Sequence, residues 1–209
     1  MNNISLSSKI LKVSKGQLEI KNGVFTLYAF IIYYEGKFEE HYALVNSKDW
    51  KIDESVPFRI NSACITSEVF GCEKCDCKWQ LDEAIHYIAE MGFGIITYHP
   101  SHEGSGHGIF EKLNSFNELG TDNTSYIDLN CEKEDARNFL PALIILDYFK
   151  ITEVTLLGNN LKKIDFLMEN GINISKIVNL IYNGSNRTTK RYILLKGRKP
   201  EHFALRKGK

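Results

Sequence analysis

The most informative part of the chain is a cysteine-rich stretch, Arg59-Ile-Asn-Ser-Ala-Cys64-Ile-Thr-Ser-Glu-Val-Phe-Gly-Cys72-Glu-Lys-Cys75-Asp-Cys77-Lys-Trp-Gln80-Leu81. Four of the five cysteines of the chain stand in it, a clustering that random placement does not explain. Cysteine thiolates are soft ligands that hold Zn²⁺ tetrahedrally. The stretch therefore predicts a metal site.

Two kinds of metal site are compatible with this spacing. If all four cysteines bind, the site is closed and structural, whereas three ligands leave one position open for water and a catalytic metal. Cys72 and Cys75 also form a Cys-x-x-Cys pair, which on its own fits a redox motif. The remaining cysteine, Cys131, stands apart and is expected to be an ordinary small buried residue.

Hydrophobic patterning around the stretch predicts an α/β fold. Residues 16–60 are expected to form strands with a hairpin turn at 35–37, and further strands are expected at 94–99 and 153–158. Helices are predicted at 76–91, from the 99–108 loop to about 119, at 135–149 and at 161–170. Pro141 either kinks the third of these helices or stands in the first turn of a helix that starts later. The alternation predicts a mixed sheet flanked by helices, with an N-terminal β-rich portion.

Charge and length restrict the class of protein. The 209 residues include 26 Lys and Arg against 26 Asp and Glu, which argues against a general nucleic-acid-binding protein and against a polybasic membrane anchor. We expect one domain over residues 1–185 and a basic C-terminal segment over 186–209, which is either solvated or faces an anionic ligand. The N-terminus lacks an apolar run of signal length and nothing approaches a membrane span, so a cytoplasmic protein is expected.

The cysteine stretch resembles the zinc motif of the GTP cyclohydrolase II family. That pattern is Arg-x-His-Ser-Glu-Cys-x-Thr-Gly-Asp, a ten-residue gap between ligand cysteines, and then Cys-Asp-Cys-Gly-x-Gln-Leu. The resemblance runs in the family's order over roughly residues 55–178, through Tyr98-His99, Glu103-Gly104, Lys112, Asp135-Ala-Arg137-Asn-Phe139, the segment 153–163 and the segment 169–173.

The resemblance implies a metal-dependent hydrolysis. Cys64, Cys75 and Cys77 match the family's ligands for one Zn²⁺ per chain, whereas Cys72 has no ligand counterpart and is either a spectator or a fourth ligand that closes the site. In this family, water attacks C8 of the guanine ring of GTP, and formate and pyrophosphate leave. The product is a diaminopyrimidine ribosyl phosphate, the first intermediate toward riboflavin.

The resemblance also assigns roles to single residues. Asp135 matches the proposed general base, although by itself it would be interpreted as a helix N-cap, and Arg137 matches the arginine of the α-phosphate step. The positions that match nucleotide contacts are Arg59, Ser62, Gln80, Glu103 and Gly104, together with Ser105 and Lys163. Mg²⁺ with the triphosphate and a homodimer are also expected.

Departures from the family pattern concentrate in the nucleotide pocket. Phe116 stands in place of a tyrosine, Ser105 in place of an arginine, Asn61 and Ala63 in place of histidine and glutamate, and Gly158 in place of threonine. The 99–108 loop gains His102 and His107. Three hypotheses follow. The first is a divergent hydrolase acting on GTP, with the sub-hypothesis that without the phenol the reaction stops at a formamidopyrimidine. The second is a paralogue acting on another heterocycle, and the third is a non-catalytic, zinc-stabilised nucleotide-binding module closed by Cys72.

Overall fold

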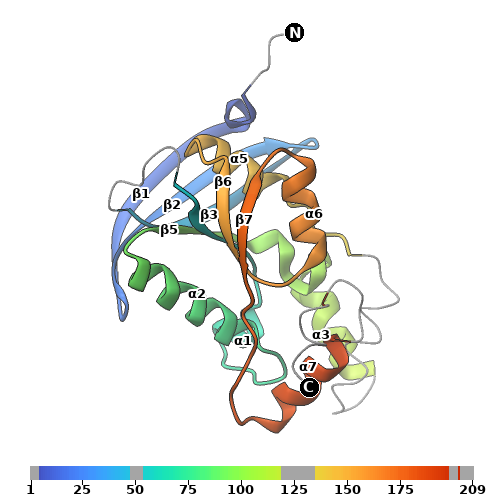
Figure 1. Cartoon of the computed structure of the whole chain (residues 1–209). Helices are drawn as coiled ribbons and strands as arrows, with labels where there is room; N and C mark the ends of the chain where they lie inside the picture. Colours follow the sequence, from blue (N-terminus) through green and yellow to red (C-terminus); the bar gives the residue numbers. More distant parts are fainter. Residues whose placement is uncertain (1–4, 48–53, 119–134, 198–201, 203–209) are drawn as a thin grey trace.

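The computed structural model describes residues 5–47, 54–118, 135–197 and 202. Within this part of the chain, seven strands form one mixed sheet in the order β1-β2-β3-β5-β4-β6-β7 (Figure 1). The strands are β1 (Ile10–Ile20), β2 (Gly23–Tyr34), β3 (Lys37–Asn46), β4 (Val56–Ser62), β5 (Gly94–His99), β6 (Glu153–Leu157) and β7 (Asn173–Val178). The helices are α1 (Ile65–Glu68), α2 (Cys77–Met91), α3 (Gly108–Glu118), α5 (Leu140–Tyr148), α6 (Leu161–Glu169) and α7 (Arg187–Lys196), with 3-10 turns at Leu6–Lys9 and Pro100–Gly106.

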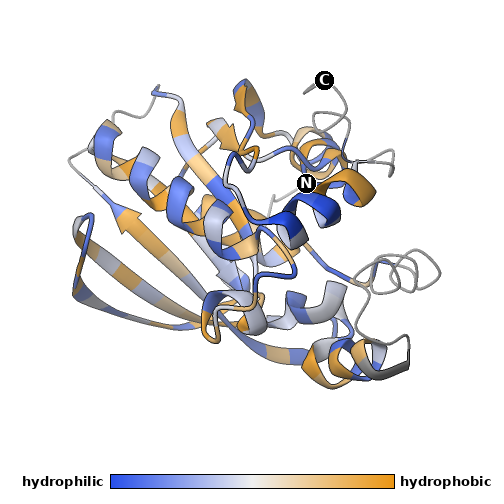
Figure 2. Ribbon diagram, turned by 90° about the horizontal axis from the view of Figure 1, so that it is seen from below, coloured by the Kyte–Doolittle hydropathy of each residue, from blue (hydrophilic) through white to orange (hydrophobic). Residues whose placement is uncertain are grey.

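The N-terminal half of the sheet is an antiparallel meander of β1, β2 and β3. Glu35 and Gly36 connect β2 to β3 with positive φ angles of 49° and 77°, the conformation of a tight hairpin turn. Buried and more exposed residues alternate along β3 and the second half of β2, as expected where one face of a sheet is buried, and Figure 2 shows hydrophobic and more hydrophilic residues in the sheet. The hairpin predicted at 35–37 is confirmed.

The second half of the sheet is parallel and places the functional residues. Strand β4 pairs in parallel with β5 on one side and with β6 on the other, and β6 pairs in parallel with β7. Helix α2 connects β4 to β5 and ends at Gly92, whose φ of 77° stops the helix. Strand β4 thus has β5 on one side and β6, which comes much later in the chain, on the other. In such sheets a ligand crevice is expected at the carboxyl ends of the strands at this point.

Helices cover both faces of the sheet. Ile95 of β5 packs in the cluster that contains α5 and α6, whereas the next residue, Ile96, packs with Ala84 and Ile88 of α2. Helix α5 is buried from Pro141 to Leu146, which explains why its sequence is apolar all round. The predicted fold class, a mixed sheet flanked by helices with a β-rich N-terminal portion, is confirmed.

Several predicted boundaries need correction. The helix predicted from 135 begins only at Leu140, with Pro141 in the first turn, where no N–H is required. Asp135 therefore stands in a loop, and Phe139 takes the N-cap position. Strand β7 and helices α1 and α7 were not predicted. Cys131 and most of the basic residues after Gly197 lie outside the described residues. None of the helices described here is long and apolar enough to span a membrane.

Candidate functional site

The motif residues gather at the carboxyl edge of the parallel strands. Arg59, Asn61 and Ser62 lie in the second half of strand β4, and Cys64 stands two residues after the strand ends, at the N-cap of α1. His99 ends β5 and leads into the turn that carries Glu103, while the segment after β6 leads to Lys163 on α6. Residues that are far apart in the sequence therefore lie at one edge of the sheet.

Three of the cysteines form a candidate metal centre. The Sγ atoms of Cys64, Cys75 and Cys77 lie within 4.8 Å of one another, and those of Cys64 and Cys75 are 3.6 Å apart. A tetrahedral zinc ion with Zn–S bonds of ~2.3 Å requires sulfurs about 3.8 Å apart, so these residues fit the ion. Among the described residues, Cys72 lies outside this group.

The three thiols differ in their pKa values. Hydrogen bonds from Cys75 and Cys77, aided by Lys112, hold the pKa of Cys64 well below its ordinary value. The hydrogen bond to Cys64 raises the pKa of Cys75 to about 12 and also raises that of Cys77. Because a bound cation stabilises all three thiolates, metal binding here would release protons.

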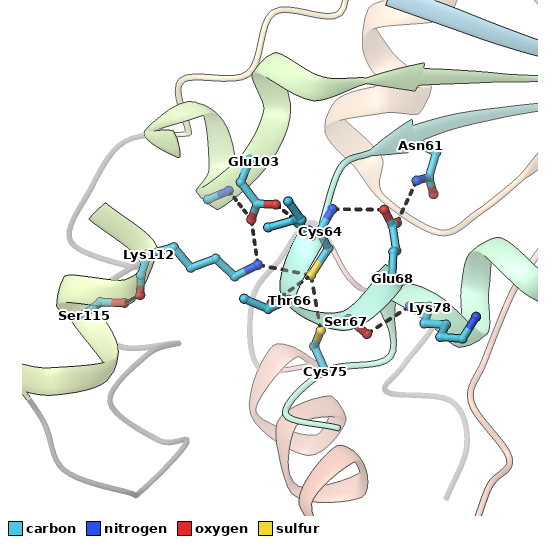
Figure 3. Close-up of polar contacts among 12 residues, drawn as sticks. Asn61, Cys64, Thr66, Ser67, Glu68, Cys75, Lys78, Glu103, Lys112 and Ser115 are labelled. Carbon is cyan, nitrogen blue, oxygen red and sulfur yellow. Dashed lines mark hydrogen bonds and ion pairs between the residues drawn. The ribbon is translucent and has the colours of Figure 1, made fainter. Parts of the chain in front are cut away.

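A buried ion pair stands beside the first cysteine (Figure 3). Lys112 Nζ donates to Cys64 Sγ at 3.1 Å and to Glu103 Oε1 at 2.7 Å. The other carboxylate oxygen of Glu103 accepts from the backbone N–H of Ile65 at 2.6 Å, and Oε1 also accepts from that of Gly104. Glu103, predicted to contact a nucleotide, thus holds the first turn of α1 and the Lys112 side chain.

Glu68 is a site residue that sequence reasoning missed. Its carboxylate accepts hydrogen bonds from Asn61 Nδ2 at 2.9 Å, from Tyr98 Oη at 2.7 Å and from the backbone N–H of Cys64 at 3.2 Å. These contacts fix the backbone at the first cysteine (Figure 3). The signal was Glu68 itself, which occupies the acidic position that closes the family's first motif.

A series of hydrogen bonds and one ion pair connects Arg59 to helix α7. The buried Arg59 guanidinium donates to Asn61 Oδ1 at 2.9 Å and to Gln80 Oε1 at 3.1 Å. Gln80 Nε2 donates to Asp76 Oδ2 at 2.6 Å, and Lys196 of α7 lies 3.4 Å from Asp76 Oδ1. Gln80 is predicted to contact the nucleotide, but in the structure its amide oxygen and its amide nitrogen both form hydrogen bonds within the protein.

Helix α7 packs on the loop that carries the cysteines. Thr189 Oγ1 donates to the backbone carbonyl of Glu73 at 2.8 Å, and Asn186 Nδ2 donates to the Glu73 carboxylate at 2.6 Å. Together with the contact between Lys196 and Asp76, these bonds tie α7 to the residues between Cys72 and Cys77. Part of the basic C-terminal segment thus faces acidic residues of this chain.

Asp135 and Arg137 form a bidentate ion pair. Arg137 Nε and Nη2 donate to the Asp135 carboxylate at 2.8 and 2.7 Å, and Lys162 adds a contact of 3.3 Å. Burial raises the pKa of Asp135, but its hydrogen bonds with Arg137 outweigh burial and leave that pKa well below its usual value. Arg137 Nη1 also donates to Ser62 Oγ at 3.3 Å.

A half-buried lysine at this edge of the sheet favours a bound anion. Lys163 Nζ donates to the carbonyl of Ile60 at 2.9 Å. Burial lowers the pKa of Lys163, and the cations Arg137, Arg59 and Lys196 lower it further. A bound anion such as phosphate would relieve this repulsion, because buried charges require partners.

The turn after β5 approaches the Asp135 loop closely. Gly104 and Ser105 have φ angles of 58° and 60°, and Ser105 O accepts from the backbone N–H of Ala136 at 3.0 Å. A Cβ at Gly106 would lie 2.7 Å from the backbone of Ala136, so this approach requires glycine.

Phe116 on α3 stands where the family pattern has a tyrosine, so the phenol hydroxyl is absent. Lys74 Nζ lies 4.2 Å from the centroid of the Phe116 ring, a cation–π contact.

Comparisons with known proteins agree with the motif. The family model described as GTP cyclohydrolase II matches residues 11–179. The chain is 33% identical over 201 residues to a GTP cyclohydrolase-2 of Pasteurella multocida, covering 95% of this chain and 90% of that protein. It is 32% identical over 171 residues to a GTP cyclohydrolase-2 of Picrophilus torridus, covering 80% of this chain and 86% of that protein.

A second kind of relative is longer than this chain. The chain is 36% identical over 175 residues to the riboflavin biosynthesis protein RibBA of Chlamydia muridarum. The match covers 81% of this chain but only 40% of that protein, so the similarity concerns one part of it. Helix α7 lies beyond the residues that the family model matches.

Proposed function

The chain belongs to the GTP cyclohydrolase II family of hydrolases, and we propose on this basis that it opens the imidazole ring of GTP at C8 in a zinc-dependent reaction. Formate and pyrophosphate leave, and a diaminopyrimidine ribosyl phosphate remains, the reaction that the resemblance implies. The names of the relatives support a place in riboflavin biosynthesis. The observation that carries the proposal is the convergence of three thiols beside a crevice lined by Arg59, Arg137 and Lys163.

The thiol group would hold the metal. A zinc ion bound by Cys64, Cys75 and Cys77 would supply a Lewis acid with an open position that activates water. Lys112, which is not itself a metal ligand, would stabilise the Cys64 thiolate by a hydrogen bond, and Glu103 would keep Lys112 in place. Since Cys72 lies outside the thiol group, the geometry favours an open site over a closed structural one.

The cations of the crevice would bind the phosphates. Arg59 on β4, Arg137 in the loop before α5 and Lys163 on α6 offer charge-assisted hydrogen bonds near the carboxyl ends of the parallel strands, where such a sheet receives its ligand. Lys163 is half-buried and lies near other cations, so a phosphate would provide a favourable partner for its charge. This arrangement supports a nucleotide with a charged tail as substrate.

Asp135 would act as the base only after its partner moves. In the structure Arg137 holds the Asp135 carboxylate with two hydrogen bonds, which makes it a weak proton acceptor. We infer that binding of Arg137 to the α-phosphate loosens this pair and raises the basicity of Asp135. Substrate binding would thereby prepare the acid–base step.

The experiment is product analysis with the purified full-length chain, GTP, Zn²⁺ and Mg²⁺. Formate and pyrophosphate are measured separately, because Phe116 lacks the phenol of the family. One formate and one pyrophosphate per GTP consumed are expected at completion, with formate appearing more slowly. Pyrophosphate without formate would mean that the reaction stops at a formamidopyrimidine, and unchanged GTP would contradict the proposal. The magnesium ion, the homodimer, the cytoplasmic location and the domain division at residue 185 stay predictions.

A further inference from the structure

His102 is a buried histidine to which no role has been assigned so far. It lies on the Pro100–Gly106 turn and is 2% exposed. Its ring stacks on His99, with centroids 4.7 Å apart, and meets the ring of Phe139 edge-on at 5.4 Å. Both ring nitrogens contact polar groups, Nε2 at 2.8 Å from the carbonyl of Asn138 and Nδ1 at 3.2 Å from Ser62 Oγ.

The partners of His102 fix the direction of its hydrogen bonds. A carbonyl oxygen only accepts, so Nε2 carries the proton. Burial lowers the pKa of His102 to about 3, which keeps the ring neutral and leaves Nδ1 as an acceptor. The Ser62 hydroxyl therefore donates to His102, and its oxygen remains free to accept from Arg137 Nη1 at 3.3 Å.

Asn138, at the other end of this series of hydrogen bonds, is held by two further hydrogen bonds. Asn138, whose carbonyl accepts from His102, donates its side-chain N–H to Glu35 at 2.8 Å and accepts from the backbone N–H of Leu140 at 2.9 Å. The turn of the β2–β3 hairpin and the first turn of α5 thus hold the group that orients the histidine.

We propose that His102 is a positioning residue that acts through Ser62 to orient the Arg137 guanidinium. Asp135 fixes Nε and Nη2 of that group, and Ser62, oriented by His102, fixes Nη1. It follows that the Ser62 oxygen accepts from Arg137 while its hydroxyl proton points to His102. Ser62 therefore does not donate a hydrogen bond to the nucleotide. The kinetic consequence rests on the proposed function, whereas the direction of the hydrogen bonds does not.

The tautomer of His102 is measured directly by long-range ¹H–¹⁵N correlation spectra of ¹⁵N-labelled full-length protein at neutral pH. The signals of His102 are assigned by their loss in His102→Gln. The expected result is a neutral ring with the proton on Nε2. A proton on Nδ1, or on both nitrogens, would overturn the proposal whether or not the protein turns over GTP.

The coupling is tested by kinetics with GTP. His102→Phe keeps an aromatic ring but removes both nitrogens, and we expect kcat to fall about tenfold with little change in KM. His102→Gln offers an amide N–H to Asn138 and an amide oxygen to Ser62, so it should restore most of the rate. His86→Gln, on the exposed face of α2, is the matched control and should leave the rate unchanged.

A double-mutant cycle separates positioning from a general structural effect. If His102 acts through Ser62, adding His102→Phe to Ser62→Ala should change kcat less than twofold. Multiplication of the two single effects would overturn the proposed route. A wild-type protein that is inactive on GTP would contradict the proposed function, and the tautomer measurement would still decide the orientation of Ser62.

Discussion

The Lys112 ammonium lies 3.1 Å from the sulfur of Cys64, although the two residues come from different elements and are far apart in the sequence. Both groups are buried, and Glu103 balances the charge of the lysine at 2.7 Å. A candidate metal ligand thus has a dedicated hydrogen-bond donor. Partners of this kind commonly tune metal affinity by 10–100-fold.

Removal of Lys112 should weaken zinc binding. Lys112→Met eliminates the hydrogen bond to the Cys64 thiolate, and we expect the zinc affinity to fall by about 10–100-fold, measured by competition with a chromophoric chelator. Lys112→Met/Glu103→Gln shows whether the buried unpaired carboxylate contributes to the effect. Unchanged affinity in both variants would exclude a role of Lys112 at the metal.

Helix α7 should slow the release of the metal. Thr189→Val removes the hydrogen bond to the Glu73 carbonyl, and Lys196→Ala removes the contact with Asp76. We expect faster zinc loss to excess chelator in both variants, because the loop between Cys72 and Cys77 is then held less firmly. Lys190→Ala, on an exposed position of the same helix, is the control. Equal release rates in all four proteins would contradict this prediction.

Phe116 should limit the release of formate. The phenol absent at this position would be a proton donor, and such groups typically contribute about 10²–10⁴ in rate. We therefore expect Phe116→Tyr to raise the rate of formate formation more than the rate of pyrophosphate formation. Because tyrosine keeps the ring that Lys74 contacts, a decrease in both rates or an unchanged ratio of the two rates would contradict this prediction.

Acid should destabilise the fold through His102. Its pKa is about 3 in the folded chain against an ordinary 6.5, so between these values the unfolded chain binds the additional proton. The free energy of unfolding then falls as the pH falls below about 6.5, by up to about 1.4 kcal/mol per pH unit for this residue. Urea unfolding at pH 7 and pH 5 should show a smaller decrease for His102→Gln than for wild type. The same decrease in both would mean that His102 does not resist protonation.

Local patterns in the sequence predicted much of the fold and the metal centre. The clustering of four cysteines predicted a metal site, and the family resemblance singled out Cys64, Cys75 and Cys77, the three thiols that the structure brings together. Helix α2 and the hairpin at Glu35 and Gly36 follow from periodicity and turn chemistry within one segment. These features depend on few distant contacts.

Features that depend on packing between distant segments could not be predicted. The pairing of Lys112 with Cys64 and the contact of α7 with Glu73 exist only after the sheet has formed. The start of α5 was ambiguous, since Pro141 is compatible with either a kink or a first turn. The direction in which Ser62 donates is set by His102 and has no signal in the sequence around Ser62.

The central claim is that three thiolates bind zinc and leave one position open. It is tested most directly by zinc X-ray absorption spectroscopy of wild type and Cys72→Ser, together with the zinc content per chain. We predict one zinc with three sulfur ligands and one oxygen or nitrogen ligand in both proteins, and loss of the metal in Cys75→Ser. Four sulfur ligands in wild type, or wild-type protein that binds no zinc, would contradict the account.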